Sequence, residues 1–178
     1  MNTNSEYDHL WSIILAGGEG NRLRTLVQHW LGYHKPKQYC TFVGTRSMLQ
    51  HTLDRADQIS SPHHKVTVIA RSHCSIAWPQ LRGRQGKVIF QPANRGTAAA
   101  VFLALAHIRA SDPRATVILH PSDHFIYPES RFVEVVKTGV QGVHRLNPCL
   151  FLLGVPAERI EPEYGWIHPG RHLGWIDG

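Results

Sequence analysis

Residues 13–38 read IILAGGEGNRLRTLVQHWLGYHKPKQ, and the rest of the chain is interpreted from this stretch. Its apolar run ends at residue 16 and is followed by three glycines within residues 17–20. A buried parallel strand that ends at an anionic ligand has this form, because glycines let backbone N–H groups approach oxygens closely. Arg22 and Lys37 add the positive charge that a polyphosphate needs. The stretch therefore predicts a phosphate-binding loop, and a tight turn without a ligand is the alternative.

This loop matches neither of two common nucleotide-binding motifs. Leu23 stands where the Rossmann fingerprint has its third glycine. A Walker loop continues from glycine into Lys and then Ser or Thr, whereas Gly20 is followed by Asn21 and Arg22. About thirty residues separate the strand from the next expected helix, far more than such connections usually need. Excursions of that length are functional or disordered, and the lysines around Pro36 favour a functional one.

Composition sets limits on the class of protein. A chain of 178 residues with 42% hydrophobic residues is long enough for one domain with one core. The net charge of +6 comes from scattered basic residues, which argues against nucleic-acid binding. Cys40, Cys74 and Cys149 are odd in number and far apart, so we expect reduced thiols. No apolar run is long enough for a membrane span and the N-terminus is polar, which predicts a cytoplasmic protein.

Strands and helices alternate along the sequence, which predicts an α/β fold with a mostly parallel sheet flanked by helices. The expected strands are 9–15, 66–70, 87–90, 116–119 and 150–155. The expected helices are 47–59, with Thr45 or Ser47 as its cap, 72–81, interrupted by Pro79, 97–110 and 130–143. In the third helix we expect Val101, Phe102, Leu105 and Ile108 on the inner side.

Ligands of parallel sheets bind outside the carboxyl ends of the strands, where several polar segments of this chain fall. The glycine loop, residues 91–97, Asp123 and Gly154 all follow expected strands. Asp123 is the candidate ligand for Mg²⁺, which prefers oxygen donors and keeps substrate phosphates in its shell. The alternative for Asp123 is a turn or a helix cap. The neighbouring His120 and His124 are expected to be hydrogen-bonding residues and not metal ligands.

No nucleophile elbow and no His-Glu-x-x-His motif occurs in the sequence. Phosphoryl and nucleotidyl transfer need neither, because an attacking phosphate is already ionised and catalysis consists of alignment and charge neutralisation. The residues therefore point to nucleotidyl transfer, with Arg22, Lys37 and a metal on Asp123 stabilising a pyrophosphate leaving group.

Five segments resemble a known family when taken together: 15–23 (LAGGEGNRL), 35–38 (KPKQ), 91–98 (QPANRGTA), 121–124 (PSDH) and 161–167 (EPEYGWI). They resemble the sugar-1-phosphate nucleotidylyltransferases, and most of all the mannose-1-phosphate guanylyltransferases. The resemblance implies a Rossmann-like nucleotidyltransferase fold. It also implies a reaction in which a nucleoside triphosphate and a sugar 1-phosphate, with Mg²⁺ as cofactor, give a nucleotide-sugar and pyrophosphate.

The resemblance also assigns residues to roles. Arg22 and Lys37 would be catalytic, and Asp123 would hold the metal. The nucleotide would be bound by Leu15, Ala16, Gly17, Gly18, Gly20, Asn21 and Arg22, with its base edge read by Gln91, Asn94, Gly96 and Thr97. The sugar phosphate would be bound by Lys37, Gly154, Glu161, Tyr164 and Gly165.

Members of this family carry a Glu-Lys-Pro sugar-binding segment and a second metal-binding Asp beyond the position of Gly178. We therefore expect residues 1–178 to form a single nucleotidyltransferase domain that is truncated at its C-terminus. GTP and mannose 1-phosphate are the expected substrates. The sheet would keep an open edge at which copies of the chain could associate, so a homo-oligomer is one expected form of the protein. The alternatives are an inactive or regulatory nucleotide-binding remnant of such an enzyme and, less favoured, a basic nucleic-acid-binding module.

Overall fold

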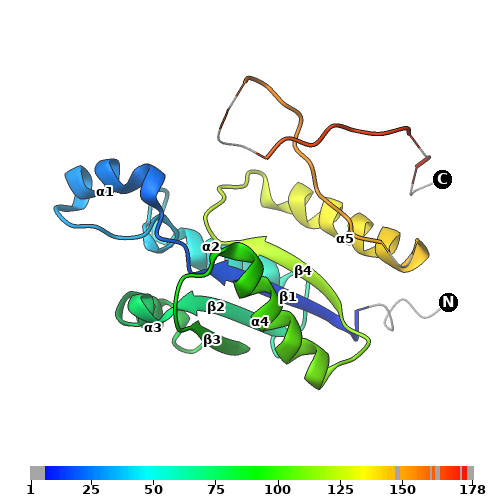
Figure 1. Ribbon diagram of the computed structural model, residues 1–178, viewed down its shortest axis with the longest axis horizontal. Helices are drawn as coiled ribbons and strands as arrows, with labels where there is room; N and C mark the ends of the chain where they lie inside the picture. Colours follow the sequence, from blue (N-terminus) through cyan, green and yellow to red (C-terminus); the bar gives the residue numbers. More distant parts are fainter. Residues whose placement is uncertain (1–6, 147–148, 161, 163–164, 173, 176–178) are drawn as a thin grey trace.

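A four-stranded parallel sheet forms the centre of the molecule in the computed structural model, which describes residues 7–146, 149–160, 162, 165–172 and 174–175. The strands follow the order β3-β2-β1-β4 (Figure 1), and all three pairings are parallel. Their bounds are β1 Leu10–Ala16, β2 Lys65–Ala70, β3 Lys87–Gln91 and β4 Thr116–Pro121. The α-helices are α1 Arg24–Leu31, α2 Met48–Asp57, α3 Cys74–Leu81, α4 Gly96–Ser111 and α5 Glu129–Arg145, and the short 3-10 helices are η1 Asn21–Leu23, η2 Lys37–Tyr39 and η3 Arg71–His73.

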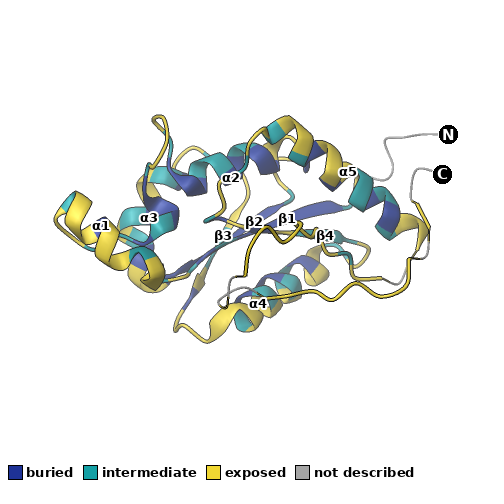
Figure 2. Ribbon diagram, turned by 90° about the horizontal axis from the view of Figure 1, so that it is seen from above, coloured by how far each residue is buried: buried dark blue, intermediate teal, exposed yellow. Residues whose placement is uncertain are grey.

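Helices cover both faces of the sheet. Figure 2 shows α4 alone on one face, with α2, α3 and α5 on the other. The alternation of side chains along β1 explains this arrangement, because successive residues of a strand point to opposite faces. Trp11 and Ile13 pack on the α4 side, whereas Leu10 and Ile14 pack on the other. A strand buried on both faces needs a continuous apolar run, which residues 13–16 supply.

The α/β class, the parallel sheet and four of the expected strands are confirmed. The long excursion after β1 is partly helical, however. It contains α1, whose only buried residue is Val27 and whose start has no side-chain cap. Leu23, Leu26, Val27, Trp30 and Leu31 recur there at helical spacing, so the sequence does carry a periodic signal, but no side-chain cap marks the start of the helix.

Two details of the expected helices were wrong. Helix α3 is not interrupted by Pro79 but continues to Leu81, because Ala77 and Leu81 anchor it in the core. Phe102 is 70% exposed, whereas Ile108 is buried and Leu105 packs against the core as expected; Ala100 and Ala104 complete the buried face of α4. Helix α4 is apolar on most of its circumference, so periodicity could not identify its inner face.

The fifth strand expected at 150–155 was also wrong. Residues 149–160 form no regular element, and Leu150 and Val155 are 86% and 89% exposed. A strand needs a neighbour with which to exchange backbone hydrogen bonds, and this segment pairs with none of the four strands.

Among the helices of the described ranges, none combines the length and apolar character that a membrane crossing requires.

Helix α2 begins with a complete capping box. Ser47 Oγ accepts a hydrogen bond from Gln50 N at 3.1 Å, and Gln50 Oε1 accepts one from Ser47 N at 3.0 Å. Ser47 Oγ also donates to Gln80 Oε1 on α3 at 2.6 Å, so this residue joins two helices. The expectation that Ser47 or Thr45 caps this helix is thus resolved in favour of Ser47.

Ser47→Ala should lower the free energy of unfolding by about 1–2 kcal/mol, because it removes the cap and leaves Gln80 without its donor. Urea unfolding of the 178-residue chain measures the change. The exposed Ser61 provides the control, since Ser61→Ala should change stability by less than about 0.5 kcal/mol. Equal effects of the two substitutions would contradict the role of the cap.

Candidate active site

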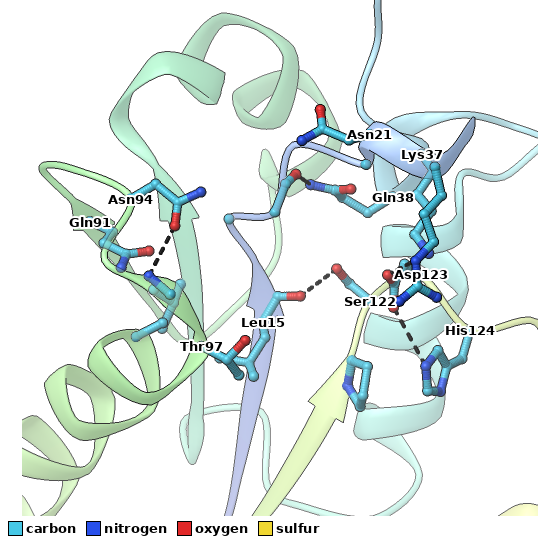
Figure 3. A pocket seen from close by; sticks show the side chains of 18 residues that line it. Leu15, Asn21, Lys37, Gln38, Gln91, Asn94, Thr97, Ser122, Asp123 and His124 are labelled. Atoms are coloured by element: carbon cyan, nitrogen blue, oxygen red, sulfur yellow. Dashed lines mark hydrogen bonds and ion pairs between the residues drawn. The ribbon is translucent and has the colours of Figure 1, made fainter. Parts of the chain in front are cut away.

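A cleft of about 710 Å³ lies at the carboxyl ends of the strands. Figure 3 shows polar side chains entering it from the glycine loop, from η2, from the start of α4 and from the segment after β4. The lining comprises Leu15, Gly17, Gly18, Gly20, Asn21, Arg22, Lys37, Gln38, Val68, Gln91, Asn94, Gly96, Thr97, Ala100, Pro121, Ser122, Asp123 and His124. Its size is typical of a small-molecule site.

The glycine loop is fastened to η2 at the end of β1. Gln38 Nε2 donates to the carbonyl oxygens of Ala16 at 3.0 Å and of Gly18 at 2.6 Å. The hydroxyl of Tyr39 donates to the same Ala16 oxygen at 2.8 Å. Burial raises the pKa of the Tyr39 phenol, so the group stays protonated and remains a donor. These bonds hold the chain where it leaves the sheet, and Ala16 itself is buried below the cleft.

Gly20 occupies a position that only glycine fits. Its φ of 66° lies in the left-handed region, and a Cβ there would lie 2.8 Å from the backbone nitrogen of Lys37. The loop therefore passes close against η2, which brings Lys37 to the cleft. Gly18, by contrast, has open space where a Cβ would stand.

Opposite charges meet at the rim of the cleft. Lys37 Nζ lies 2.8 Å from Asp123 Oδ2, and His124 Nε2 lies 3.7 Å from Asp123 Oδ1. The side chain of Asp123 is 32% exposed, so its carboxylate is accessible to a ligand. Ser122 Oγ donates to the carbonyl oxygen of Leu15 at 2.6 Å, which ties the end of β4 to β1.

The opposite wall of the cleft carries amide groups (Figure 3). Asn94 Oδ1 accepts a hydrogen bond from Gly96 N at 3.0 Å, which closes the turn into α4. Gln91 is 6% exposed, and within the described ranges its Nε2 has no hydrogen-bond partner. A buried amide donor without a partner is costly, and a ligand that accepts its hydrogen bond relieves that cost.

Below the cleft, His120 is buried inside the fold. Its Nε2 lies 3.1 Å from Ser12 Oγ, which in turn accepts from Ser60 Oγ at 2.8 Å. Burial, assisted by the positive charge of Arg55, lowers the pKa of His120 to about 4. The ring is therefore neutral at pH 7 and acts as a structural hydrogen-bonding group.

Most of the residues assigned from the sequence come together in this cleft. They are Leu15, Gly17, Gly18, Gly20, Asn21, Arg22, Lys37, Gln91, Asn94, Gly96, Thr97 and Asp123. Ala16, which was also assigned to the nucleotide, is buried and does not line the cleft.

The residues assigned to the sugar phosphate, other than Lys37, do not join this group. Gly154 and Gly165 are exposed and do not line the cleft, because the expected strand before Gly154 does not form. Glu161 and Tyr164 lie outside the described residues.

Sequence reasoning missed the roles of Gln38 and Ser122. Both were part of quoted motifs, but only their hydrogen bonds to backbone oxygens of residues 15–18 show that they hold the loop. For Ser122, the signal available in the sequence was its place directly after a strand, beside Asp123.

The chain is similar in sequence to several known proteins. The sequence model of a family described as nucleotidyl transferase matches residues 11–174. Among curated proteins, this chain is 31% identical over 169 residues to mannose-1-phosphate guanylyltransferase RfbM of Salmonella typhimurium, covering 91% of this chain and 33% of that protein. It is 29% identical to a mannose-1-phosphate guanylyltransferase of Escherichia coli, with 90% and 34% covered. The chain thus spans about a third of the length of these curated relatives.

Solved structures agree on the fold. A crystal structure described as mannose-1-phosphate geranyltransferase from Thermus thermophilus superposes with a TM-score of 0.59 at 26% identity. The superposition covers 73% of this chain and 37% of that one.

Gly20→Ala should destabilise the chain by about 1–3 kcal/mol, because the new Cβ would meet η2 and the residue would keep a left-handed conformation. Urea unfolding measures the loss. Gly18→Ala is the matched control, since a Cβ there has open space, and it should cost less than about 1 kcal/mol. A cost for Gly18→Ala as large as that for Gly20→Ala would contradict the described loop.

Acid should destabilise the protein through His120. Its pKa in the folded state lies below the usual 6.5. Between pH 6.5 and pH 4 this histidine is therefore protonated in the unfolded chain but stays neutral in the folded chain, which favours unfolding. Its contribution to stability is complete above pH 6.5, and about 3 kcal/mol should be lost on descending to pH 4. Unfolding free energies at pH 7 and pH 4.5 test this, with His120→Gln as the comparison. A decline of equal size in the variant would assign the acid sensitivity elsewhere.

Proposed function

Since this chain belongs to the nucleotidyl transferase family, we propose that its cleft binds a nucleoside triphosphate with Mg²⁺ and takes part in nucleotidyl transfer to a sugar 1-phosphate. GTP and mannose 1-phosphate are the favoured substrates. The observation that carries the proposal is the meeting of the glycine loop, Lys37 and Asp123 in one cleft.

The phosphates would lie between the glycine loop and η2. Exposed backbone N–H groups of a loop held by Gln38 suit phosphate oxygens, because they approach without an intervening side chain. Lys37 is 23% exposed and directed toward Asp123, so its ammonium group is available at the rim. Arg22 lines the same cleft and adds a second cation.

The proposed step forms a bond between a phosphate oxygen of the sugar 1-phosphate and the α-phosphorus of the triphosphate. The bond from the α-phosphorus to the bridging oxygen breaks, and pyrophosphate leaves with the electron pair. The attacking oxygen is already ionised, so no general base is needed. Lys37 and Arg22 would align the two phosphates and offset their charge, which is the main task of catalysis in such reactions.

Asp123 fits a magnesium site of the kind that nucleotides complete. Mg²⁺ commonly takes one or two carboxylates together with substrate phosphates and waters, and Asp123 supplies an accessible carboxylate beside the phosphate loop. The described residues contain no group of three His, Cys, Asp or Glu that could hold a metal without substrate. When bound, Mg²⁺ supplies positive charge that stabilises the pyrophosphate leaving group.

Gln91 supports a preference for GTP over ATP. Its side-chain amide lines the cleft and, when turned with Nε2 toward the base, would donate to a carbonyl oxygen such as O6 of guanine, where adenine has an amino group. Gly17 leaves room for this amide, because a Cβ there would lie 3.3 Å from Gln91 Oε1. The proposal of mannose 1-phosphate rests on the names of the relatives, since within the described ranges only Lys37 of the residues assigned to the sugar phosphate lines the cleft.

Thermal melting of the 178-residue chain with GTP, ATP, CTP or UTP and Mg²⁺, followed by a pyrophosphate-release assay with mannose 1-phosphate, tests the proposal. GTP at a hundred times its dissociation constant should stabilise the fold by about 2.7 kcal/mol. Stabilisation without turnover would support nucleotide binding and contradict catalysis by these 178 residues. No stabilisation by any nucleotide would overturn the proposal.

Lys37→Ala should weaken GTP binding by about tenfold or more, because it removes a charged partner of the phosphates. Isothermal titration with Mg²⁺ and GTP measures the change. Lys137→Ala is the matched control, since Lys137 is exposed on α5 and does not line the cleft. Equal GTP affinities of the two variants would show that Lys37 has no part in binding.

A further inference from the structure

Arg55 of α2 is a charged residue buried below the loop that carries Asp123. Its side chain is 2% exposed. The guanidinium donates from Nη1 to Glu129 Oε1 at 3.0 Å, and from Nη2 to Thr52 Oγ1 at 2.8 Å and to the His124 carbonyl oxygen at 3.3 Å. It thus bonds both ends of residues 124–129, the segment that joins the cleft to α5.

Burying a guanidinium costs several kcal/mol unless hydrogen-bond acceptors in the protein replace the water that its donors lose. Thr52 is a local partner on the same helix, and its own hydroxyl donates to the Met48 carbonyl oxygen at 2.9 Å. The other two acceptors, of His124 and Glu129, lie about seventy residues away along the chain. The planar fork of Arg55 therefore connects α2 to this loop, a task that the point charge of a lysine fulfils poorly.

Helix α2 also supports the other side of the charge pair. Tyr39 of η2 packs in one core cluster with Leu49 and Leu53 of α2, and Lys37 lies in the same short helix η2. Helix α2 thus supports both members of the charge pair. It supports Lys37 through the apolar packing of Tyr39, and Asp123 through the hydrogen bond from Arg55 to the carbonyl oxygen of His124. The two charged groups that lie 2.8 Å apart therefore have one helix in common beneath them.

We infer that Arg55 is a positioning residue that holds the Asp123 carboxylate in place for a divalent cation bound with the nucleotide. This rests on the proposed function, in which Asp123 binds Mg²⁺. Groups that orient metal ligands in this way commonly change metal affinity by about ten- to a hundredfold when they are replaced. Arg55 does not touch the cleft itself, so its replacement should act on the metal and not on the nucleotide.

The test compares GTP affinity with Mg²⁺ and with EDTA, by isothermal titration well below the melting temperature. Arg55→Lys should reduce the enhancement by Mg²⁺ about tenfold and leave the affinity in EDTA within about twofold of that of the unmodified chain. Arg84→Lys is the matched control. Arg84 bonds Asp54 and Asp57 of the same helix but is remote from this loop, so Arg84→Lys should keep the full enhancement.

Other outcomes separate this inference from the proposed function. If Mg²⁺ does not enhance GTP binding to the unmodified chain, or if Asp123→Asn keeps the enhancement, the metal role of Asp123 is wrong and the inference falls with it. If Asp123→Asn abolishes the enhancement and Arg55→Lys keeps it, the inference alone is overturned. Should Arg55→Lys fail to fold, Glu129→Gln weakens one bond of Arg55 at a partly exposed residue and must also reduce the enhancement.

Discussion

The carbonyl oxygen of Ala16 accepts hydrogen bonds from both Gln38 and Tyr39, and the arrangement of the site depends on this junction. It lies where β1 leaves the sheet, so the backbone of the glycine loop starts from a point that is held by the core. Because Gln38 also donates to the Gly18 oxygen, the loop cannot swing away from η2 without breaking this part-buried hydrogen bond. The bonds to the Ala16 oxygen are fully buried, and losing one of them would leave an unsatisfied polar group in the interior, at a cost of about 1–3 kcal/mol.

From this junction the two kinds of charge reach one cleft by separate routes. The cation of Lys37 comes from η2, one residue before Gln38, and the carboxylate of Asp123 comes from the end of β4. The two meet at 2.8 Å, and a triphosphate with its metal would have to enter between them. A site whose charges already compensate each other is stable before a ligand binds. The same groups then serve phosphate and metal when the substrate supplies opposite charges.

Much of this could be predicted, because the features were local. The apolar run before the glycines, the β-branched strand at 66–70 and the polar residues after each strand predicted the parallel sheet and its binding edge. What could not be predicted depended on distant partners. Nothing near Phe102 reveals that the small residues of α4 face the sheet, and the run at 150–155 reads as a strand although no neighbour pairs with it. The roles of Gln38 and Arg55 likewise require contacts that only the fold creates.

The most direct test of the central claim, that the glycine loop binds a nucleoside triphosphate, is a titration of GTP and Mg²⁺ into the isotopically labelled 178-residue chain, followed by amide NMR. We expect the signals of Gly17, Gly18 and Gly20 to shift together with saturation, because their backbone N–H groups would receive phosphate oxygens. Gly83 and Gly86, which line a separate surface pocket beside β3, should stay in place. Shifts confined to Gly83 and Gly86, or no shift at the loop at saturating GTP, would contradict the claim.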